Sequence, residues 1–276
     1  MALITIGFIM AGLFVNPLFI CAFVMIVSAI AAFELTKNVA GIKSKAVNAG
    51  AAVFSAIVVY ILLGFRRTAV MLGQKSLYYK RDILLAGVVC IYALCMVVFT
   101  LIKHKEMDLA KILTGICAVP FLSFVFVFMG GIINVKNGVY YILLLFVFSS
   151  GCDMGAYFTG VTIGKHKLCP ELSPKKTVEG AIGGIVTTIV LTLVVVFIFK
   201  NHIDISTAKI VATVLLSVPL CIIGMMGDLF ASAIKRSVGI KDYGNLIPGH
   251  GGILDRFDSI LMISPVLYGL IRLGVI

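Results

Sequence analysis

The chain has 276 residues, of which 61% are hydrophobic and only 13% are charged, and its formal net charge is +11. A water-soluble domain carries about 25% charged residues, so this composition excludes an ordinary soluble domain. Apolar runs of about 20 residues, the length that crosses a bilayer, instead predict an all-α polytopic transmembrane protein. A transmembrane β-barrel would show alternating segments of about ten residues, and the sequence has none. Lys and Arg lie between the apolar runs without forming a compact basic domain, which favours contact with anionic membrane lipids over nucleic-acid binding.

About nine spans are expected in chain order, roughly at 2–15, 18–36, 49–64, 83–102, 112–130, 139–162, 181–199, 209–234 and 257–274. The first two could form one long or re-entrant segment, and we interpret the first as a membrane helix, not a removable signal peptide. The connectors are too short for a separate soluble domain. Seven scattered cysteines without a CxxC pair are expected to be small buried residues, not disulfides or metal ligands.

Polar chemistry is concentrated in the second half, because eight of the twelve carboxylates follow residue 150. This predicts an N-terminal transmembrane scaffold over 1–138 and a C-terminal transmembrane catalytic half over 139–276. The connectors 164–180 and 237–256 should share one membrane side, which we assign to the cytoplasm on functional grounds. The basic connector 65–82 would lie on the other side, against the positive-inside trend.

The first polar stretch is 149–184, "SSGCDMGAYFTGVTIGKHKLCPELSPKKTVEGAIGG". Asp153 lies within a span, where an ionisable residue suggests a functional site, the alternative being an interfacial ion pair with lysine. Ser173 and Pro174 suit the start of a helix, which would place Lys175 and Lys176 in its first turn. The helix dipole disfavours lysine there, so either a bound anion resolves the conflict or these are ordinary juxtamembrane lysines. Three glycines would let neighbouring helices approach closely or leave room for a ligand, and packing is the favoured interpretation: Gly155, Gly160 and Gly164.

The second stretch is "GMMGDLFASAIKR", residues 224–236. Its polar residues share one helical face, because their spacing is i, i+4, i+7 and i+8: Asp228, Ser232, Lys235 and Arg236. A carboxylate with cations above it on one face can hold a metal ion and the anion that the metal coordinates. A simple intrahelical ion pair is the alternative, but it does not explain why Asp228 lies so far inside the apolar run.

The third stretch is "NLIPGHGGILDRFDS", residues 245–259. The glycines around His250 predict a loop with exposed backbone amides that phosphate could approach. Asp255 and Asp258 are three residues apart and share a helix face, where two like charges repel unless a cation lies between them. Their oxygens suit Mg²⁺, with Asp228 as a third carboxylate, although acidic residues at a helix N-terminus are also favoured by the dipole.

The sequence contains no GxSxG, HExxH or Walker-type motif. Carboxylates for a metal, cations for phosphate and glycines for close approach are together the parts of phosphoryl or nucleotidyl transfer.

Residues 232–259, "SAIKRSVGIKDYGNLIPGHGGILDRFDS", resemble the signature of the CDP-diacylglycerol synthases, also called phosphatidate cytidylyltransferases. The signature reads Ser-x-x-Lys-Arg, Lys-Asp, Pro-Gly-His-Gly-Gly and Asp-Arg-x-Asp, and residues 153–180 are similar to the family's upstream block. The resemblance implies an enzyme that joins CTP and phosphatidic acid into CDP-diacylglycerol and pyrophosphate. It also implies a homodimer, a site at the cytoplasmic face of a bacterial inner membrane, and Mg²⁺ as cofactor, and it admits a monovalent cation such as K⁺.

The resemblance also implies roles for individual residues. The metal ligands would be Asp228, Asp255 and Asp258, which belong to the catalytic set. The rest of the catalytic set would be Lys235, Arg236, His250 and Arg256. The substrate-binding set would be Asp153, Ser173, Lys175, Lys176, Thr177, Glu179, Lys241, Asp242, Gly249, Gly251 and Gly252. Asp242 is the weaker member, since it could simply pair with Lys241.

Two other functions use some of the same parts. A CTP-dependent polyprenol kinase would transfer the γ-phosphoryl group instead of the cytidylyl group. An ion transporter would use Asp153 and Asp228 as intramembrane ligands and would require a discontinuous helix in mid-membrane. Charges gathered at one membrane face beside a glycine loop favour an enzyme, and the complete motif order over 232–259 favours the cytidylyltransferase.

Overall fold

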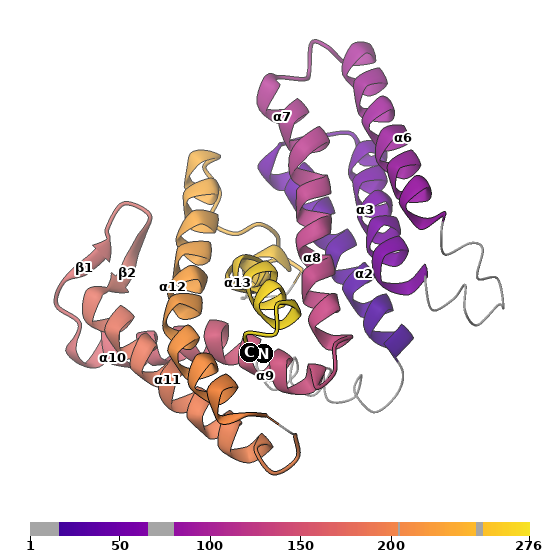
Figure 1. Ribbon diagram of the computed structural model, residues 1–276. Helices are drawn as coiled ribbons and strands as arrows, with labels where there is room; N and C mark the ends of the chain where they lie inside the picture. Colours follow the sequence, from indigo (N-terminus) through magenta and orange to yellow (C-terminus); the bar gives the residue numbers. More distant parts are fainter. Residues whose placement is uncertain (1–16, 66–79, 204, 247–250) are drawn as a thin grey trace. The chain divides into compact units, whose positions relative to one another are not determined.

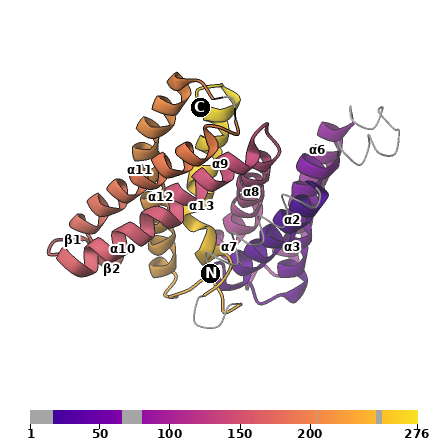
Figure 2. The ribbon, with the colours of Figure 1, turned by 90° about the horizontal axis from the view of Figure 1, so that it is seen from below.

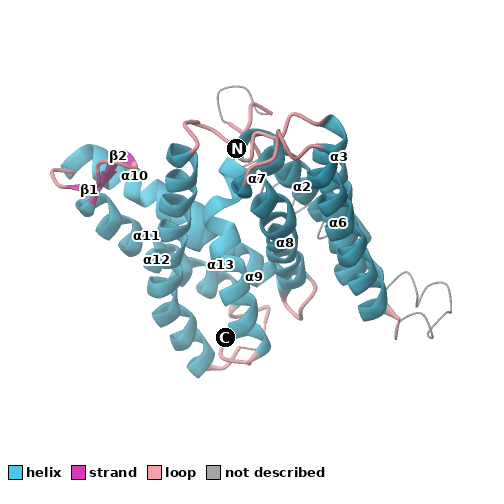
Figure 3. Ribbon diagram, turned by 90° about the horizontal axis from the view of Figure 1, so that it is seen from above, coloured by secondary structure: helices cyan, strands magenta, loops and turns pink. Residues whose placement is uncertain are grey.

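The computed structural model describes residues 17–65, 80–203, 205–246 and 251–276. Helices make up most of these residues, which confirms the all-α fold class (Figure 1 and Figure 3). Seven segments within the described part are long and apolar enough to cross a membrane: Phe19–Val39, Lys45–Gly64, Arg81–Ile102, Leu109–Ile133, Gly138–Ile163, Val178–Phe199 and Thr207–Ser237. They correspond to seven of the nine predicted spans.

The two remaining predicted spans lie at the ends of the chain. Segment 2–15 falls outside the described residues. Segment 257–274 corresponds to helix α13, Leu254–Arg272. The charges in the first turns of α13 make it more polar than the seven other segments. The chain is an integral membrane protein of helical type.

The fold separates into two compact units, and each is described by itself. Among described residues, unit 1 contains 131–203, 205–239 and 257–276, and unit 2 contains 17–65, 80–130, 240–246 and 251–256. The break near residue 131 precedes the boundary expected at 138, and the division into a scaffold and a catalytic half stays a prediction. The segment 240–256, however, groups with the N-terminal helices.

Unit 2 is a group of apolar helices that includes three π-helical turns. Its elements are α2 (Pro17–Glu34), η1 (Leu35–Val39), α3 (Lys45–Val59), η2 (Tyr60–Gly64), α6 (Arg81–Ile102), α7 (Leu109–Leu113), η3 (Thr114–Ala118) and α8 (Val119–Ile133). Two of the π-helical turns extend α2 and α3, and the third joins α7 to α8. Helices α2 and α3 pack against each other (Figure 1). In the core the Phe54 and Tyr92 rings stack with centroids 4.0 Å apart, and the Tyr92 hydroxyl donates to the Gly115 carbonyl at 3.1 Å. Such a bond satisfies a polar group that would be costly to leave unpaired away from water.

Unit 1 holds the polar half of the sequence. Its elements are α9 (Gly138–Phe146), η4 (Val147–Gly151), α10 (Cys152–Ile163), β1 (Lys167–Cys169), β2 (Ser173–Thr177), α11 (Val178–Phe199), α12 (Thr207–Ser237) and most of α13. Helices α10 and α11 lie side by side with the β1–β2 hairpin at one end (Figure 2). A Cβ at Gly155 would overlap Thr187, and one at Gly160 would press on Thr177. The packing role predicted for these two glycines is therefore confirmed.

The helix predicted to start at Ser173 and Pro174 begins four residues later. Ser173–Thr177 is strand β2, which pairs antiparallel with β1 in the register Lys167↔Thr177 and Cys169↔Ser173. Helix α11 starts at Val178, and the Thr177 side chain caps it by accepting from the Gly180 amide at 3.1 Å. Thr177 takes the capping role that the sequence suggested for Ser173, because Ser173 belongs to the paired strand of the hairpin. Lys175 and Lys176 are thus outside the first helical turn, so the conflict with the helix dipole that suggested a bound anion does not arise.

All seven cysteines are free thiols, as expected. Cys21, Cys152 and Cys221 are buried, as predicted. Three others, Cys90, Cys95 and Cys117, are exposed on apolar spans, so burial was the wrong expectation for them.

Candidate active site

Helix α12 carries the second polar stretch in unit 1. It is continuous from Thr207 to Ser237, so its 31 residues extend about 46 Å at the usual helical rise. Asp228 lies 21 residues after the helix start, about 32 Å along the axis, which is close to the hydrocarbon thickness of a bilayer. The stripe predicted from the spacing is therefore helical, and the predicted position of Asp228 at a membrane interface stays a prediction. Lys235 is buried, whereas Arg236 is exposed.

An ion pair joins the first and second polar stretches. Lys176 Nζ, from strand β2, lies 2.5 Å from Asp228 Oδ2 on α12, and both side chains are about three-quarters buried. Lys175, the neighbour of Lys176, is exposed. The hairpin therefore separates two lysines that the sequence could not distinguish, and it turns one of them toward α12.

Further charges in unit 1 surround this pair. Asp153 on α10 is close enough to Lys176 and Asp228 for their charges to interact. Asp258 on α13 interacts in the same way with Asp228, Asp153 and the buried Lys235. Unit 1 thus brings together three carboxylates and two ammonium groups from four elements, which leaves one excess negative charge when all are ionised.

This arrangement fits a magnesium ion that is completed by substrate. Among described residues no three His, Cys, Asp or Glu side chains converge as the ligands of one ion do. Mg²⁺, however, commonly takes only one or two protein carboxylates and fills its remaining positions with water and substrate phosphates. Asp228 and Asp258 would supply hard oxygen ligands of this kind.

Glu179, in the first turn of α11, holds the base of the hairpin. Its carboxylate accepts from the backbone amides of Lys165 and His166, both at 3.1 Å, and lies 2.6 Å from His166 Nδ1. These contacts give Glu179 a structural task that the sequence did not indicate. The predicted roles of Glu179, Ser173 and Thr177 in substrate binding stay predictions.

In unit 2, Asp255 organises the loop before α13. Its Oδ2 atom accepts from the Tyr243 amide at 2.7 Å and from the Gly252 amide at 3.0 Å. The Gly252 amide is therefore hydrogen-bonded within the protein, and its predicted role in substrate binding stays a prediction. A Cβ at Gly251, whose φ is +80°, would meet the Asp255 carboxylate, so glycine is favoured at 251 by backbone conformation and by space.

The other residues predicted for the site in this region are exposed to solvent or lie outside the described residues. Lys241, Asp242 and Arg256 are exposed. Gly249 and His250 lie outside the described residues.

Glu34, near the end of α2, is a residue of this region that the sequence did not point to. Its side chain is buried, with 4% exposure, and accepts from the Ile253 amide at 3.0 Å and the Leu254 amide at 2.9 Å. A Cβ at Gly244 or Gly252 would overlap its carboxylate. The sequence did contain a feature that could have identified Glu34, because it is a single acidic residue in an apolar run. The same feature identified Asp153 as a candidate.

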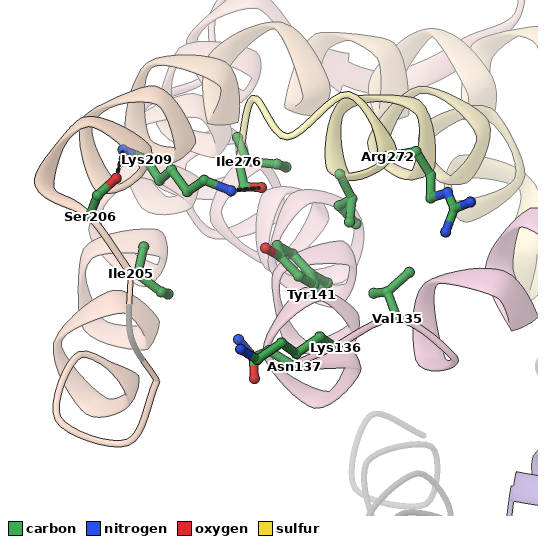
Figure 4. A pocket seen from close by; sticks show the side chains of 10 residues that line it. Val135, Lys136, Asn137, Tyr141, Ile205, Ser206, Lys209, Arg272 and Ile276 are labelled. Atoms are coloured by element: carbon green, nitrogen blue, oxygen red, sulfur yellow. Dashed lines mark hydrogen bonds between the residues drawn. The ribbon is translucent and has the colours of Figure 1, made fainter.

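A separate cavity of about 530 Å³ opens in unit 1 where α9 and α12 begin and α13 ends (Figure 4). Its lining includes Lys136, Lys209 and Arg272, and Lys209 donates to the backbone oxygen of Ile276 at 3.2 Å. None of the predicted site residues is among the described residues that line it. Because Asp228 is near the far end of α12, this cavity is distinct from the charged cluster.

Comparison with known proteins gives a consistent result. The model of the "Cytidylyltransferase family" matches residues 1–273. A phosphatidate cytidylyltransferase of Bacillus subtilis is 41% identical over 176 residues, which cover 63% of this chain and 61% of that protein. Namesakes from Staphylococcus saprophyticus and Haemophilus influenzae are 36% identical over 200 residues and 42% identical over 129 residues. These alignments cover 72% and 47% of this chain, and 73% and 44% of the respective relatives.

The chain spans about three fifths of the Bacillus subtilis relative and about half of a Staphylococcus haemolyticus relative that is 44% identical. The match to the family model, by contrast, extends over nearly all of the chain. Together with the motif order over 232–259 and the helical membrane fold, it shows that this chain belongs to the cytidylyltransferase family.

Proposed function

We propose that this protein condenses CTP with phosphatidic acid to give CDP-diacylglycerol and pyrophosphate. The observation that carries the proposal is the ion pair between Lys176 and Asp228, because it joins two motif blocks that are separate in the sequence. The names of the relatives, all phosphatidate cytidylyltransferases, support the same reaction.

The charged cluster suits the physical problem of this reaction. CTP and phosphatidic acid are both polyanions, so their approach costs Coulomb repulsion that grows as the local dielectric constant falls. Lys176, Lys235 and Arg236 would offset that repulsion by binding phosphate oxygens. Mg²⁺, held by Asp228 and Asp258 with Asp255 as a further candidate, would polarise a phosphoryl oxygen as a Lewis acid.

No strong base is required, because the phosphate oxygen of phosphatidic acid is already a nucleophile. The residues of the site would therefore act by holding that oxygen in line with the α-phosphorus of CTP and by stabilising negative charge. A site at the end of α12, about one bilayer thickness from the start of that helix, would let the acyl chains stay in lipid. We place this end of the helix at the cytoplasmic face of the inner membrane, where CTP is available, and expect a homodimer.

The two alternative functions have less support. The transporter requires a discontinuous helix, and α12 is continuous through Asp228. The polyprenol kinase shares the metal and the cations, but the named relatives do not favour it.

Labelled CTP tests the proposal directly. Purified protein incubated with phosphatidic acid should transfer a label from the cytosine ring, but not from the γ-phosphate, into the lipid phase. Pyrophosphate should appear in equal amount, and chelation of Mg²⁺ should stop the reaction. Transfer of the γ-label to a polyprenol, with phosphatidic acid inert, would replace this proposal with the kinase.

A further inference from the structure

We infer that Glu34 is a positioning residue that fixes the start of α13, and with it Asp255 and Arg256, in the geometry that the reaction needs. The inference rests on the proposed function for its catalytic consequence, although the anchoring itself does not. It begins from the burial of a carboxylate in the apolar helix α2. Burying a carboxylate costs folding free energy unless hydrogen bonds compensate it. The hydrogen-bond partners of Glu34 therefore indicate its structural role.

The partners of Glu34 are the backbone amides at the entrance to α13. Oε1 accepts from Ile253 and Oε2 from Leu254, which is the first residue of the helix. The first amides of a helix have no partner within that helix and need an external acceptor. Glu34 therefore caps α13 from a residue more than 200 positions away in the sequence. A carboxylate provides both acceptors at once, whereas a glutamine would replace one acceptor with a donor that faces an N–H group.

Two further features show that the fit around Glu34 is close. Gly244 and Gly252 both approach the carboxylate so nearly that an added Cβ would overlap it. Asn38, one helical turn after Glu34, donates to the Tyr243 carbonyl. Tyr243 in turn donates its amide to Asp255. The end of α2 and its η1 extension thus hold the loop at two points, one on each side of the segment 244–252.

The contacts of Glu34 affect function because the backbone that they hold, at Ile253 and Leu254, continues directly into Asp255. Asp255 immediately follows Leu254, and its carboxylate accepts amides from the same loop. A shift of about 1 Å in positioned groups can cost on the order of a hundredfold in rate. Loss of the Glu34 contacts should therefore lower the rate of the bound complex more than it weakens the binding of CTP.

The test compares Glu34→Gln, which preserves side-chain volume, with Thr36→Val as the matched control. Thr36 is buried two residues away and donates to Ala32 and Phe33 carbonyls within its own helix. Glu34→Gln should lower kcat at least tenfold while KM for CTP changes less than threefold. Hydrogen–deuterium exchange in the full-length protein should accelerate in a peptide covering 251–257 and stay unchanged in one covering 213–221. Thr36→Val should keep kcat within twofold and leave exchange in 251–257 unchanged.

Asn38→Ala keeps the inference testable if Glu34→Gln is not recovered folded, because it removes only one peripheral hydrogen bond. It should lower kcat by about threefold to tenfold, less than two charged contacts would. Faster exchange in 251–257 with kcat within twofold of wild type, in either variant, would overturn the positioning role. An equal loss of kcat in Thr36→Val would also overturn it, since general destabilisation would then explain the effect. A wild-type protein that makes no cytidine-bearing lipid would refute the proposed function, and the exchange experiment would still decide the anchoring.

Discussion

The two adjacent lysines of strand β2 should behave differently, and this is the sharpest prediction from the charged cluster. Lys176→Gln removes the partner of Asp228, while Lys175→Gln changes an exposed residue beside it. Two unit charges 2.5 Å apart attract by about 7 kcal/mol at an effective dielectric constant of about 20. Desolvation and lost side-chain entropy offset most of that energy, and hydrogen bonds to charged groups contribute about 1.5–3 kcal/mol net.

This range corresponds to about a 10-fold to 150-fold loss, because about 1.4 kcal/mol is a factor of ten. We expect Lys176→Gln to lower kcat/KM by that factor and Lys175→Gln to lower it less than threefold. The assay measures incorporation of base-labelled CTP into lipid at saturating phosphatidic acid. Thermal unfolding in detergent should show that both variants are folded. Equal losses in the two variants, or a loss under threefold for Lys176→Gln, would refute the reasoning from the ion pair.

Three further variants test other contacts. Asp255→Asn should reduce turnover more than a hundredfold with the protein still folded, because it removes the charge of a candidate metal ligand, while the amide oxygen can still accept from the Tyr243 and Gly252 amides. Near-normal activity at low Mg²⁺ would contradict the metal role. Gly252→Ala should lower the unfolding temperature because its Cβ overlaps Glu34, whereas Gly50→Ala, an open position inside α3, should raise it. If Gly252→Ala also raises it, the close packing around Glu34 is wrong. Thr177→Val keeps the side-chain volume but removes the cap of α11, which should cost about 1 kcal/mol in the free energy of unfolding. An unchanged unfolding temperature would argue against the cap.

The sequence predicted which residues belong to the charged cluster, but it did not predict which of them contact each other. Periodicity placed Asp228 and Lys235 on one helical face, because every residue of a helix repeats the same backbone geometry. It could not select between Lys175 and Lys176, since both are compatible with a strand or a helix start. The choice depends on the pairing of Lys167 with Thr177, which fixes the direction of each side chain in the hairpin.

The amino-acid sequence is sufficient to predict the class of protein and most of its spans. Seven described helices match predicted runs, because a bilayer accepts only segments whose side chains are apolar and whose backbone is hydrogen-bonded internally. It also determined the family, through a motif that is contiguous over 232–259. Both properties are local, so they can be recognised from neighbouring residues.

The role of Glu34, by contrast, becomes visible in the folded chain. Its two hydrogen bonds connect residues separated by 219 and 220 positions, and no local pattern relates an acid at the end of α2 to amides at the start of α13. The two are coupled because α13 enters the structure with unpaired amides away from bulk water, where an acceptor must come from whichever helix packs there. The helix that supplies this acceptor is set by the long-range packing of the chain, which is a property of the folded molecule.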